Sequence, residues 1–294
     1  MKKILSTCIL LLIAVMASAQ VKVAPKLKKG DKKVYVSESV TTIAGQKPIT
    51  ITSETRYKVA RKTADGYVLD VVTTDVQTDA DKDDMMGRTF SLATEVMKDV
   101  RITLATDKDG KVTKILNYEE VKDNAEKVID KILKEVPATP GFSTEVIKEQ
   151  IAGQITEESL LKQMQMNRSP LVLNGKTITT GMEDEYLDQQ GIKMKRTYTV
   201  GDAGTIQAAS TINLTGEELK QMILAQIKKV VPEQTDVIQQ NIDAIMESGV
   251  LKFRMDVKDV YTMQADGWVK EITSEMNSDT MGQKAKVSST IRLK

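Results

Sequence analysis

The chain contains no histidine, and its single cysteine, Cys8, lies close to its start. Histidine is the usual general base, and histidine and cysteine together supply most nucleophile–base pairs and soft metal ligands. The chain beyond Gln20 therefore lacks the common means of nucleophilic catalysis, zinc binding and disulfide formation. We predict no cofactor, no metal site and no catalytic residue, which favours a protein that is not an enzyme.

Aromatic residues and excess charge are also scarce. One tryptophan, seven tyrosines and three phenylalanines offer few of the stacking surfaces that carbohydrate sites use. Without Lys2 and Lys3, the 42 basic residues fall to 40 against 41 acidic ones. Such a balance provides no basic face for phosphates, so we expect no nucleic-acid partner. Glycine-rich phosphate loops are absent from the sequence as well.

The first residues have the pattern of a signal peptide. Two lysines precede an apolar stretch from Ile4 to Met16, and Ala17-Ser18-Ala19 then supplies the small residues that signal peptidase requires. We predict cleavage before Gln20, which makes residues 1–19 the signal peptide. Cys8 precedes most of the apolar stretch, so we expect no lipidation. The remaining chain has no run of about twenty apolar residues, and we expect a soluble protein exported to the periplasm or beyond.

Two stretches of the sequence resemble each other. Residues 101–110 and 196–204 each form an alternating pattern that ends at an Asp/Gly turn. Each is followed by a strand pattern, a Glu-Glu pair, an amphipathic helix and a Val-Pro pair that ends the helix. This order predicts an internal duplication with halves at 20–168 and 169–294, which can share one continuous sheet.

Apolar residues at three-and-four spacing predict four amphipathic helices in two pairs. The first pair covers about 121–136 and 146–155, and the second covers about 219–230 and 237–245. Thr215 and Glu218 form a capping-box pattern before the third helix. Runs rich in Val, Ile, Thr and Tyr predict strands at 33–43, 48–61, 66–79, 99–106, 111–117, 176–188, 191–200, 204–214, 250–263, 267–279 and 283–293.

Short turns between these strands make them antiparallel neighbours. The predicted fold class is α+β, with a long curved antiparallel β-sheet, or sheets, and two pairs of amphipathic helices packed on one side. Residues 79–97 fit neither pattern and are predicted to form a loop with a short helix. The lysines of Lys26–Lys33 are expected to form a solvated flexible arm.

Three patterns that suggest chemistry have plainer explanations. The acidic stretch from Asp75 to Asp84 lacks the spacing of a calcium loop and is interpreted as a solvated turn. Ser159 and Lys162 have the Ser-x-x-Lys spacing of penicillin-binding enzymes, but they lie in an amphipathic helix without a partner motif. Carboxylates such as Glu183-Asp184-Glu185 could serve a glycoside hydrolase only if two of them faced each other.

Thirteen of the 15 methionines follow Gln20. Methionine adapts its shape, so these residues suit either ordinary core filling or the lining of a pocket for variable apolar ligands. If the helices and the sheet enclose such a pocket, its predicted ligand-binding residues are Val128, Ile132, Met222, Ile223, Ile227 and Ile245.

Three short motifs are similar to those of a known family: the Ala-Ser-Ala-Gln end of the leader, the Lys28-Lys29-Gly30-Asp31 start and the strand-Gly-Gln-strand hairpins. They resemble a family of exported proteins of similar length from Gram-negative bacteria, which implies no catalytic residue. The predicted curved sheet with helices on its concave face is similar to periplasmic lipoprotein carriers, which hold acyl chains between sheet and helices. The apparent duplication and the two helix pairs depart from that carrier pattern.

Three functional hypotheses follow. The first is a non-enzymatic exported binding protein that holds a lipid or other apolar small molecule between sheet and helices. The second is a structural or protein-interaction module of the periplasm or cell surface, with a protein partner. The third is a carboxylate-based hydrolase, which requires a cleft with two facing acids.

Overall fold

The computed structural model describes residues 20–81, 91, 98–135, 156–166, 169–187, 193–221, 224, 239, 242, 253–280 and 282–294. The predicted signal peptide, the predicted helix at 146–155 and most of the predicted loop at 79–97 lie outside these residues. Within the part of the chain that is described, no helix is long and apolar enough to cross a membrane.

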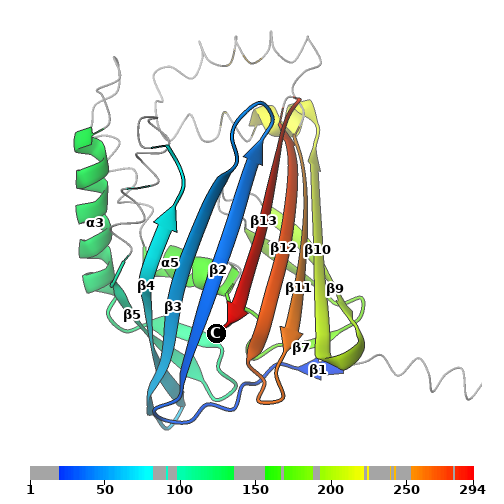
Figure 1. Ribbon diagram of the computed structural model, residues 1–294. Helices are drawn as coiled ribbons and strands as arrows, with labels where there is room; N and C mark the ends of the chain where they lie inside the picture. The colour runs from blue at the N-terminus through cyan, green and yellow to red at the C-terminus, as the bar shows by residue number, and fades with distance from the viewer. Residues whose placement is uncertain are drawn as a thin grey trace, which may run out of the picture.

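Eleven strands form one open sheet with the order β6-β5-β4-β3-β2-β13-β12-β11-β10-β9-β8 (Figure 1). Every neighbouring pair is antiparallel, which confirms the predicted long antiparallel sheet. The strands are β2 (Lys32–Ile43), β3 (Ile49–Lys62), β4 (Gly66–Thr78), β5 (Arg101–Asp107), β6 (Val112–Ile115), β8 (Glu183–Leu187), β9 (Lys193–Val200), β10 (Thr205–Leu214), β11 (Phe253–Met263), β12 (Val269–Thr280) and β13 (Gln283–Leu293).

The centre of the sheet pairs β2 with β13, which are the first and last long strands of the chain. In this pair Ser39 lies opposite Ser289, and Ser37 lies opposite Ile291. Strands β3 to β6 continue the sheet on one side of the pair, and β12 to β8 continue it on the other. The long strands of both predicted halves therefore belong to one continuous sheet.

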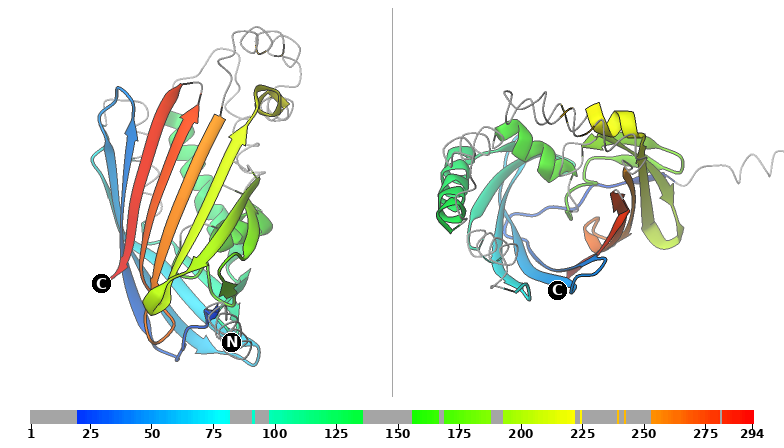
Figure 2. Two further views of the ribbon diagram at one scale, coloured as in Figure 1. Left: turned by 90° about the vertical axis from the view of Figure 1, so that its right-hand side faces the viewer. Right: turned by 90° about the horizontal axis from the view of Figure 1, so that it is seen from above.

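The sheet is curved, and from above it has a C-shaped cross-section (Figure 2). We call its concave side the trough. Burial alternates along β9, where Met194, Arg196 and Tyr198 are buried and the residues between them are exposed. Alternating residues point to opposite faces of a sheet, so one face is covered. A buried cluster joins Tyr198 and Tyr261 to Leu173, which lies outside the sheet, and so the covered face is the trough.

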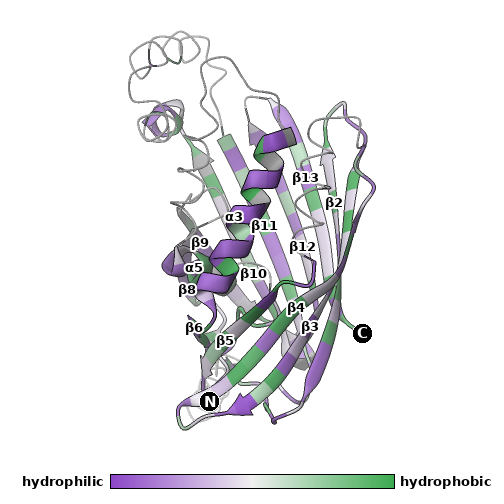
Figure 3. Ribbon diagram, turned by 90° about the vertical axis from the view of Figure 1, so that its left-hand side faces the viewer, coloured by the Kyte–Doolittle hydropathy of each residue, from purple (hydrophilic) through white to green (hydrophobic). Residues whose placement is uncertain are grey.

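Helices α3 (Tyr118–Glu135) and α5 (Glu157–Met166) flank the sheet (Figure 3). Helix α3 corresponds to the first predicted helix, and it buries Val121 and Ile129 from its apolar stripe. Most of its remaining surface is hydrophilic. Leu161 and Met164 of α5 pack against the core of the trough. A short 3-10 helix, η1 (Asp202–Gly204), precedes β10.

The third predicted helix begins as expected, because residues 216–221 and 224 are helical. The backbone N–H of Glu218 donates to Thr215 Oγ1 at 3.3 Å, and the backbone N–H of Thr215 donates to Glu218 Oε2 at 2.9 Å. These reciprocal bonds confirm the predicted capping box. The helix pairs and the duplication stay predictions: β6 is an edge strand of the sheet, whereas β10 lies inside it.

The predicted strand at 176–188 is two strands, β7 (Thr177–Thr179) and β8. Gly181 lies between them with a φ of +84°, a left-handed conformation that interrupts a strand. Strand β7 pairs with β1 (Gln20–Lys22) in a separate two-stranded sheet. The continuous strand pattern at 176–188 therefore corresponds to two strands that belong to different sheets.

Residues 23–31, which we call the strap, cross the trough from β1 to β2 (Figure 2). The backbone N–H of Lys26 donates to the carbonyl of Asp266 at 2.8 Å, and that of Gly30 donates to Val59 at 2.8 Å. Val23 and Leu27 are buried. The prediction of a flexible arm over Lys26–Lys33 is therefore wrong. An extended strap exposes alternate residues, so its lysine side chains face solvent while the chain itself is bound on both sides.

Candidate functional site

A bridging segment, residues 169–176, links α5 to β7 between the two edges of the sheet. Asn174 Nδ2 donates to the carbonyl of Gly110, in the β5–β6 turn, at 3.2 Å. The backbone N–H of Gly175 donates to Val23 at 2.8 Å, and that of Val23 donates to Lys176 at 2.9 Å. Leu173 in the middle of the segment is fully buried. These contacts hold the end of the segment that joins β7 and fix the backbone that carries Lys176.

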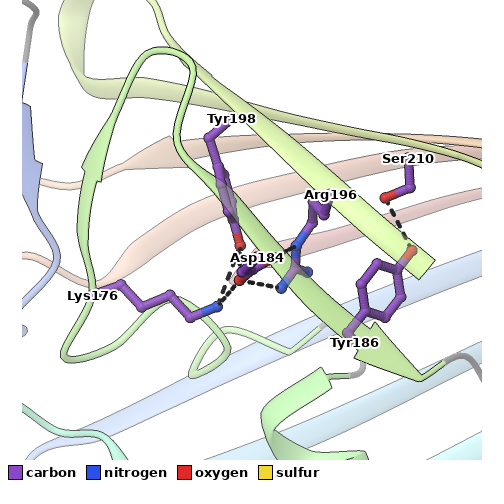
Figure 4. A network of polar contacts seen from close by, with 6 residues as sticks. All are labelled: Lys176, Asp184, Tyr186, Arg196, Tyr198 and Ser210. Atoms are coloured by element: carbon purple, nitrogen blue, oxygen red, sulfur yellow. Dashed lines mark hydrogen bonds and ion pairs between the residues drawn. The ribbon is translucent and has the colours of Figure 1, made fainter. Parts of the chain in front are cut away.

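Asp184 on β8 accepts four hydrogen bonds from three side chains (Figure 4). Arg196, its partner on β9, donates Nε to Oδ1 at 2.9 Å and Nη2 to Oδ2 at 3.0 Å. Lys176 Nζ lies 2.6 Å from Oδ2, and the hydroxyl of Tyr198 donates to the same oxygen at 2.9 Å. Both carboxylate oxygens are therefore engaged, and the bidentate arginine fixes the orientation of the carboxylate.

Two tyrosines hold Arg196 in place. Its guanidinium carbon lies 4.7 Å from the ring centre of Tyr186 and 5.2 Å from that of Tyr198, within the range of cation–π attraction. The hydroxyl of Tyr186 donates to Ser210 Oγ at 3.2 Å on the neighbouring strand β10. Only 4% of the Arg196 side chain is exposed. The guanidinium is therefore held by contacts with both tyrosine rings as well as by Asp184.

Burial and charge set the protonation states of the network. Burial raises the pKa of Asp184, but the hydrogen bonds from Arg196 and Lys176 outweigh it and the net pKa lies below its ordinary value. Burial is the main cause that lowers the pKa of Lys176, and repulsion from Arg196 and Lys111 adds to it against the attraction of Asp184. Burial also raises the pKa of the Tyr198 hydroxyl. A general acid needs a raised pKa, so Asp184 is not suited to that role.

A cleft of about 480 Å³ adjoins the network. Four basic and two acidic residues border it together with an apolar wall contributed by α5, β6 and the bridging segment. The basic groups are Lys111, Lys162, Lys176 and Arg196, the acidic groups are Asp184 and Glu185, and the apolar wall consists of Val112, Met164, Leu171 and Val172. Among the described residues, no three acidic side chains gather as a metal site requires.

The six predicted ligand-binding residues are not among those that line this cleft. Val128 and Ile132 lie in α3, but their side chains are outside what the structure describes. Met222, Ile223, Ile227 and Ile245 lie outside the described residues altogether. All six stay predictions. Of the methionines considered for a pocket, Met164 both packs against the core and lines the cleft.

The Ser-x-x-Lys pattern has a structural role in α5. Ser159 and Thr156 exchange backbone-to-hydroxyl hydrogen bonds at 3.1 Å, which caps the start of the helix. Lys162 forms an ion pair with Glu158 one turn earlier at 2.7 Å. Both side chains thus make contacts within the helix, as expected for an amphipathic helix without a partner motif.

Sequence reasoning did not single out Lys176, Asp184 and Arg196 as a group. One signal was available, because the predicted strands at 176–188 and 191–200 flank a Gln-Gln-Gly turn and form a hairpin. Counting outward from that turn places Asp184 opposite Arg196, with tyrosines two residues away on the same face. Lys176 could not be found in this way, since it reaches the network from the bridging segment.

No family model matches the chain, and no curated protein matches it. Among solved structures, the chain is similar to lipovitellin, in a structure concerned with lipid–protein interactions, with a TM-score of 0.38 and 7% identity. The match covers 92% of this chain but only 25% of the lipovitellin chain. An outer membrane channel from Pseudomonas putida F1 matches with a TM-score of 0.16 and 8% identity, over 92% of this chain and 98% of the channel. Both similarities are too loose to carry a functional argument.

Proposed function

We propose that the chain is a non-enzymatic exported binding protein that holds a lipid or other apolar small molecule between the sheet and the helices. The cleft beside α5 is the observation that carries this proposal. Its volume of about 480 Å³ lies within the usual range for small-molecule pockets, roughly 300–1,000 Å³. One wall is apolar, as in small-molecule pockets generally, and the other carries charged groups that can fix the orientation of a ligand.

The cleft is also supported by what surrounds it. Leu171 and Met164 connect its apolar wall to the cluster around Tyr35 and Leu69 in the trough. The bridging segment below it is hydrogen-bonded to the strap and to the β5–β6 turn. These hydrogen bonds restrain one wall of the cleft, and a restrained wall loses less conformational entropy when a small molecule binds.

The alternative of a strand-addition module receives less support. The edge strands β6 and β8 have four and five residues. Helix α5 packs beside β6, and such short edges offer few free backbone groups to an added strand. The hydrolase alternative needs two facing acids, whereas Asp184 and Glu185 are successive residues of one strand and point to opposite faces.

The experiment is a lipid inventory of the chain from Gln20 onward, purified after export and without detergent. Native mass spectrometry and organic extraction should reveal a bound acyl compound, or the protein should bind the neutral apolar dye N-phenyl-1-naphthylamine in a saturable manner with a rise in fluorescence. A protein that carries no extractable compound and does not bind the dye would contradict the proposal.

A further inference from the structure

The charges of the network do not balance. Arg196 and Lys176 contribute two positive charges, and Asp184 contributes one negative charge. The side chains of Asp184 and Lys176 are 21% and 27% exposed, so water screens this excess only in part. An uncompensated charge in such a place is unfavourable for folding, because it is partly removed from water. An anion that enters the cleft would compensate this excess positive charge, so the interaction of the network with the anion is favourable.

Lys176 has a hydrogen-bond donor to spare. An ammonium group has three N–H donors, and two of them are directed to Asp184 Oδ2 at 2.6 Å and to the Tyr198 oxygen at 3.3 Å. Lys176 also lines the cleft. Among the described residues no acceptor is bound to the third donor, which is available to a group inside the cleft. A charge-assisted hydrogen bond from this position is stronger than one made in open water.

Two further lysines enlarge the positive field at the cleft. Lys111 lies against the bridging segment, where its Cβ is 2.8 Å from the position that a Cβ on Gly175 would take. Lys162 lies across the cleft on α5, and its ion pair with Glu158 is weak because the two side chains are 52% and 76% exposed. An anionic group beside Lys176 would thus have three ammonium groups around the same cleft.

A second hollow shows that an excess of basic over acidic residues does not by itself distinguish the cleft beside α5. The second hollow has a volume of about 300 Å³ and is lined by four lysines and two aspartates, which is the same difference in charge. Its lining residues are Lys26, Lys28, Asp31, Lys32, Lys33 and Asp266, all of them charged. Of these two hollows, the cleft beside α5 is the one that combines an excess of positive charge with an apolar wall. This combination selects molecules that are anionic at one end and apolar at the other.

We propose that the cleft recognises an amphipathic anion, with the anionic headgroup bound by Lys176 and the acyl chain packed along Met164, Leu171 and Val172. This inference rests on the proposed function and specifies the ligand class of the same site. A fatty-acid carboxylate and a lipid phosphate share the required chemistry, namely oxygen acceptors that carry a negative charge.

The test measures displacement of N-phenyl-1-naphthylamine by three compounds with the same chain and different headgroups, each below its micelle concentration. These compounds are dodecanoate, dodecyl phosphate and 1-dodecanol. We expect dodecanoate or dodecyl phosphate to displace the dye at about tenfold lower concentration than dodecanol, as one charge-assisted hydrogen bond provides. The comparison of dodecanoate with dodecyl phosphate shows whether the site prefers a fatty-acid carboxylate or a lipid phosphate. Without a cationic site the order would reverse, because an ion loses more hydration on binding.

The variant Lys176→Met should reduce this preference to about onefold or reverse it, while dodecanol displaces the dye as before. Lys28→Met, at the second hollow, is the matched control and should keep the wild-type preference. Lys111→Met serves as a second variant with a smaller expected loss, about threefold, should Lys176→Met fold poorly by circular dichroism.

The outcomes separate the two proposals. If the dye binds but wild-type protein does not prefer the anions, or if folded Lys176→Met keeps the full preference, the inference about the headgroup is overturned and the binding function stands. If Lys176→Met does not fold, a full preference in Lys111→Met overturns the inference in the same way. If the wild-type protein binds neither the dye nor any of the three compounds, the proposed function fails and the inference fails with it.

Discussion

Two clusters of aromatic and charged side chains lie at different places in the trough. In the first, Tyr35 and Tyr57 pack edge to face at 5.5 Å between ring centres, Trp268 joins at 6.5 Å, and Lys33 and Asp266 form an ion pair of 2.8 Å. The second is the network of Lys176, Asp184 and Arg196 with Tyr186 and Tyr198. Both combine tyrosines with lysine and aspartate, and only their charge balance and surroundings differ.

In the first cluster each charge has one partner and the aromatic rings are closed off from solvent. The hydroxyl of Tyr35 donates to the carbonyl of Val269 at 2.6 Å, and burial raises the pKa of Tyr57 to about 12. In the second cluster one carboxylate faces two cations beside a cleft. The first arrangement is what stability requires. The second combines a local excess of positive charge with an apolar wall, and this combination is what supports the proposed binding site.

The largest expected effect concerns the two aspartates. Asp184→Ala should lower the free energy of unfolding by about 3 kcal/mol, because it leaves Arg196 and Lys176 partly buried without a counter-charge. Asp266→Ala should cost about 1 kcal/mol, since Asp266 is 39% exposed and forms an ion pair with one cation only. Urea unfolding curves with matched slopes measure both. Equal costs would remove the distinction between the two clusters.

The strap that closes the first cluster can be tested through Gly267, next to Trp268. Gly267 has a φ of +83°, and a Cβ there would lie 2.7 Å from the carbonyl oxygen of Ala24 and 2.9 Å from Cα of Pro25. Gly267→Ala should cost about 2 kcal/mol, from backbone strain and from displacement of the strap. Gly282 has the same φ with nothing within 4 Å, so Gly282→Ala should cost about 1 kcal/mol. Thermal unfolding measures the loss of stability in both variants, and the difference between the two losses is the contribution of the strap. If the two losses are equal, the strap makes no contribution.

Acid should affect the second cluster more than the first. The folded-state pKa of Asp184 lies below its ordinary value of 3.8, so its contribution to stability is complete above that value and is lost as the pH falls further. The stability difference between wild type and Asp184→Asn should therefore shrink by about 1 kcal/mol between about pH 6 and about pH 3. Asp266→Asn should show a smaller change, because Asp266 is more exposed. Urea midpoints at the two pH values provide the comparison.

The smallest expected effect concerns Lys176 in the absence of any bound compound. Its folded-state pKa is lowered from 10.5, so the charged form opposes folding at neutral pH, and its bond to Asp184 only offsets this. Lys176→Met should change the free energy of unfolding by less than about 1 kcal/mol, in either direction. If Lys176→Met lowered the free energy of unfolding by nearly as much as Asp184→Ala, the role of Lys176 would be to stabilise the fold and not to bind a ligand.

Local sequence patterns were sufficient for most of the sheet and for the start of two helices. Alternation and Gly-containing turns located β2, β3 and β4 well, and the Thr215–Glu218 capping box is formed as predicted. Local patterns failed where a segment is held by distant partners. The strap has the composition of a solvated arm, yet its backbone forms hydrogen bonds with Val59 and Asp266. Residues close to the strap in the sequence give no sign of these distant partners.

The candidate site shows the same limit. Asp184 and Arg196 could be paired from their hairpin, but the cleft combines β6, α5, the bridging segment, β8 and β9. These elements meet only because β2 pairs with β13 and the sheet curves until its two edges approach the bridging segment. Curvature and this central pairing are properties of the whole chain. For that reason the predicted lining residues were chosen from helix stripes, and Lys176 was not among them.

The most direct measurement is a carbon-13 NMR titration of carboxyl-labelled dodecanoate mixed with delipidated protein. We predict a separate bound carboxylate signal whose titration midpoint lies below that of the free acid, because Lys176 stabilises the ionised form, and which weakens in Lys176→Met. A spectrum with only the free signal, or a bound signal that titrates above the free acid as burial without a cation would cause, would contradict the account.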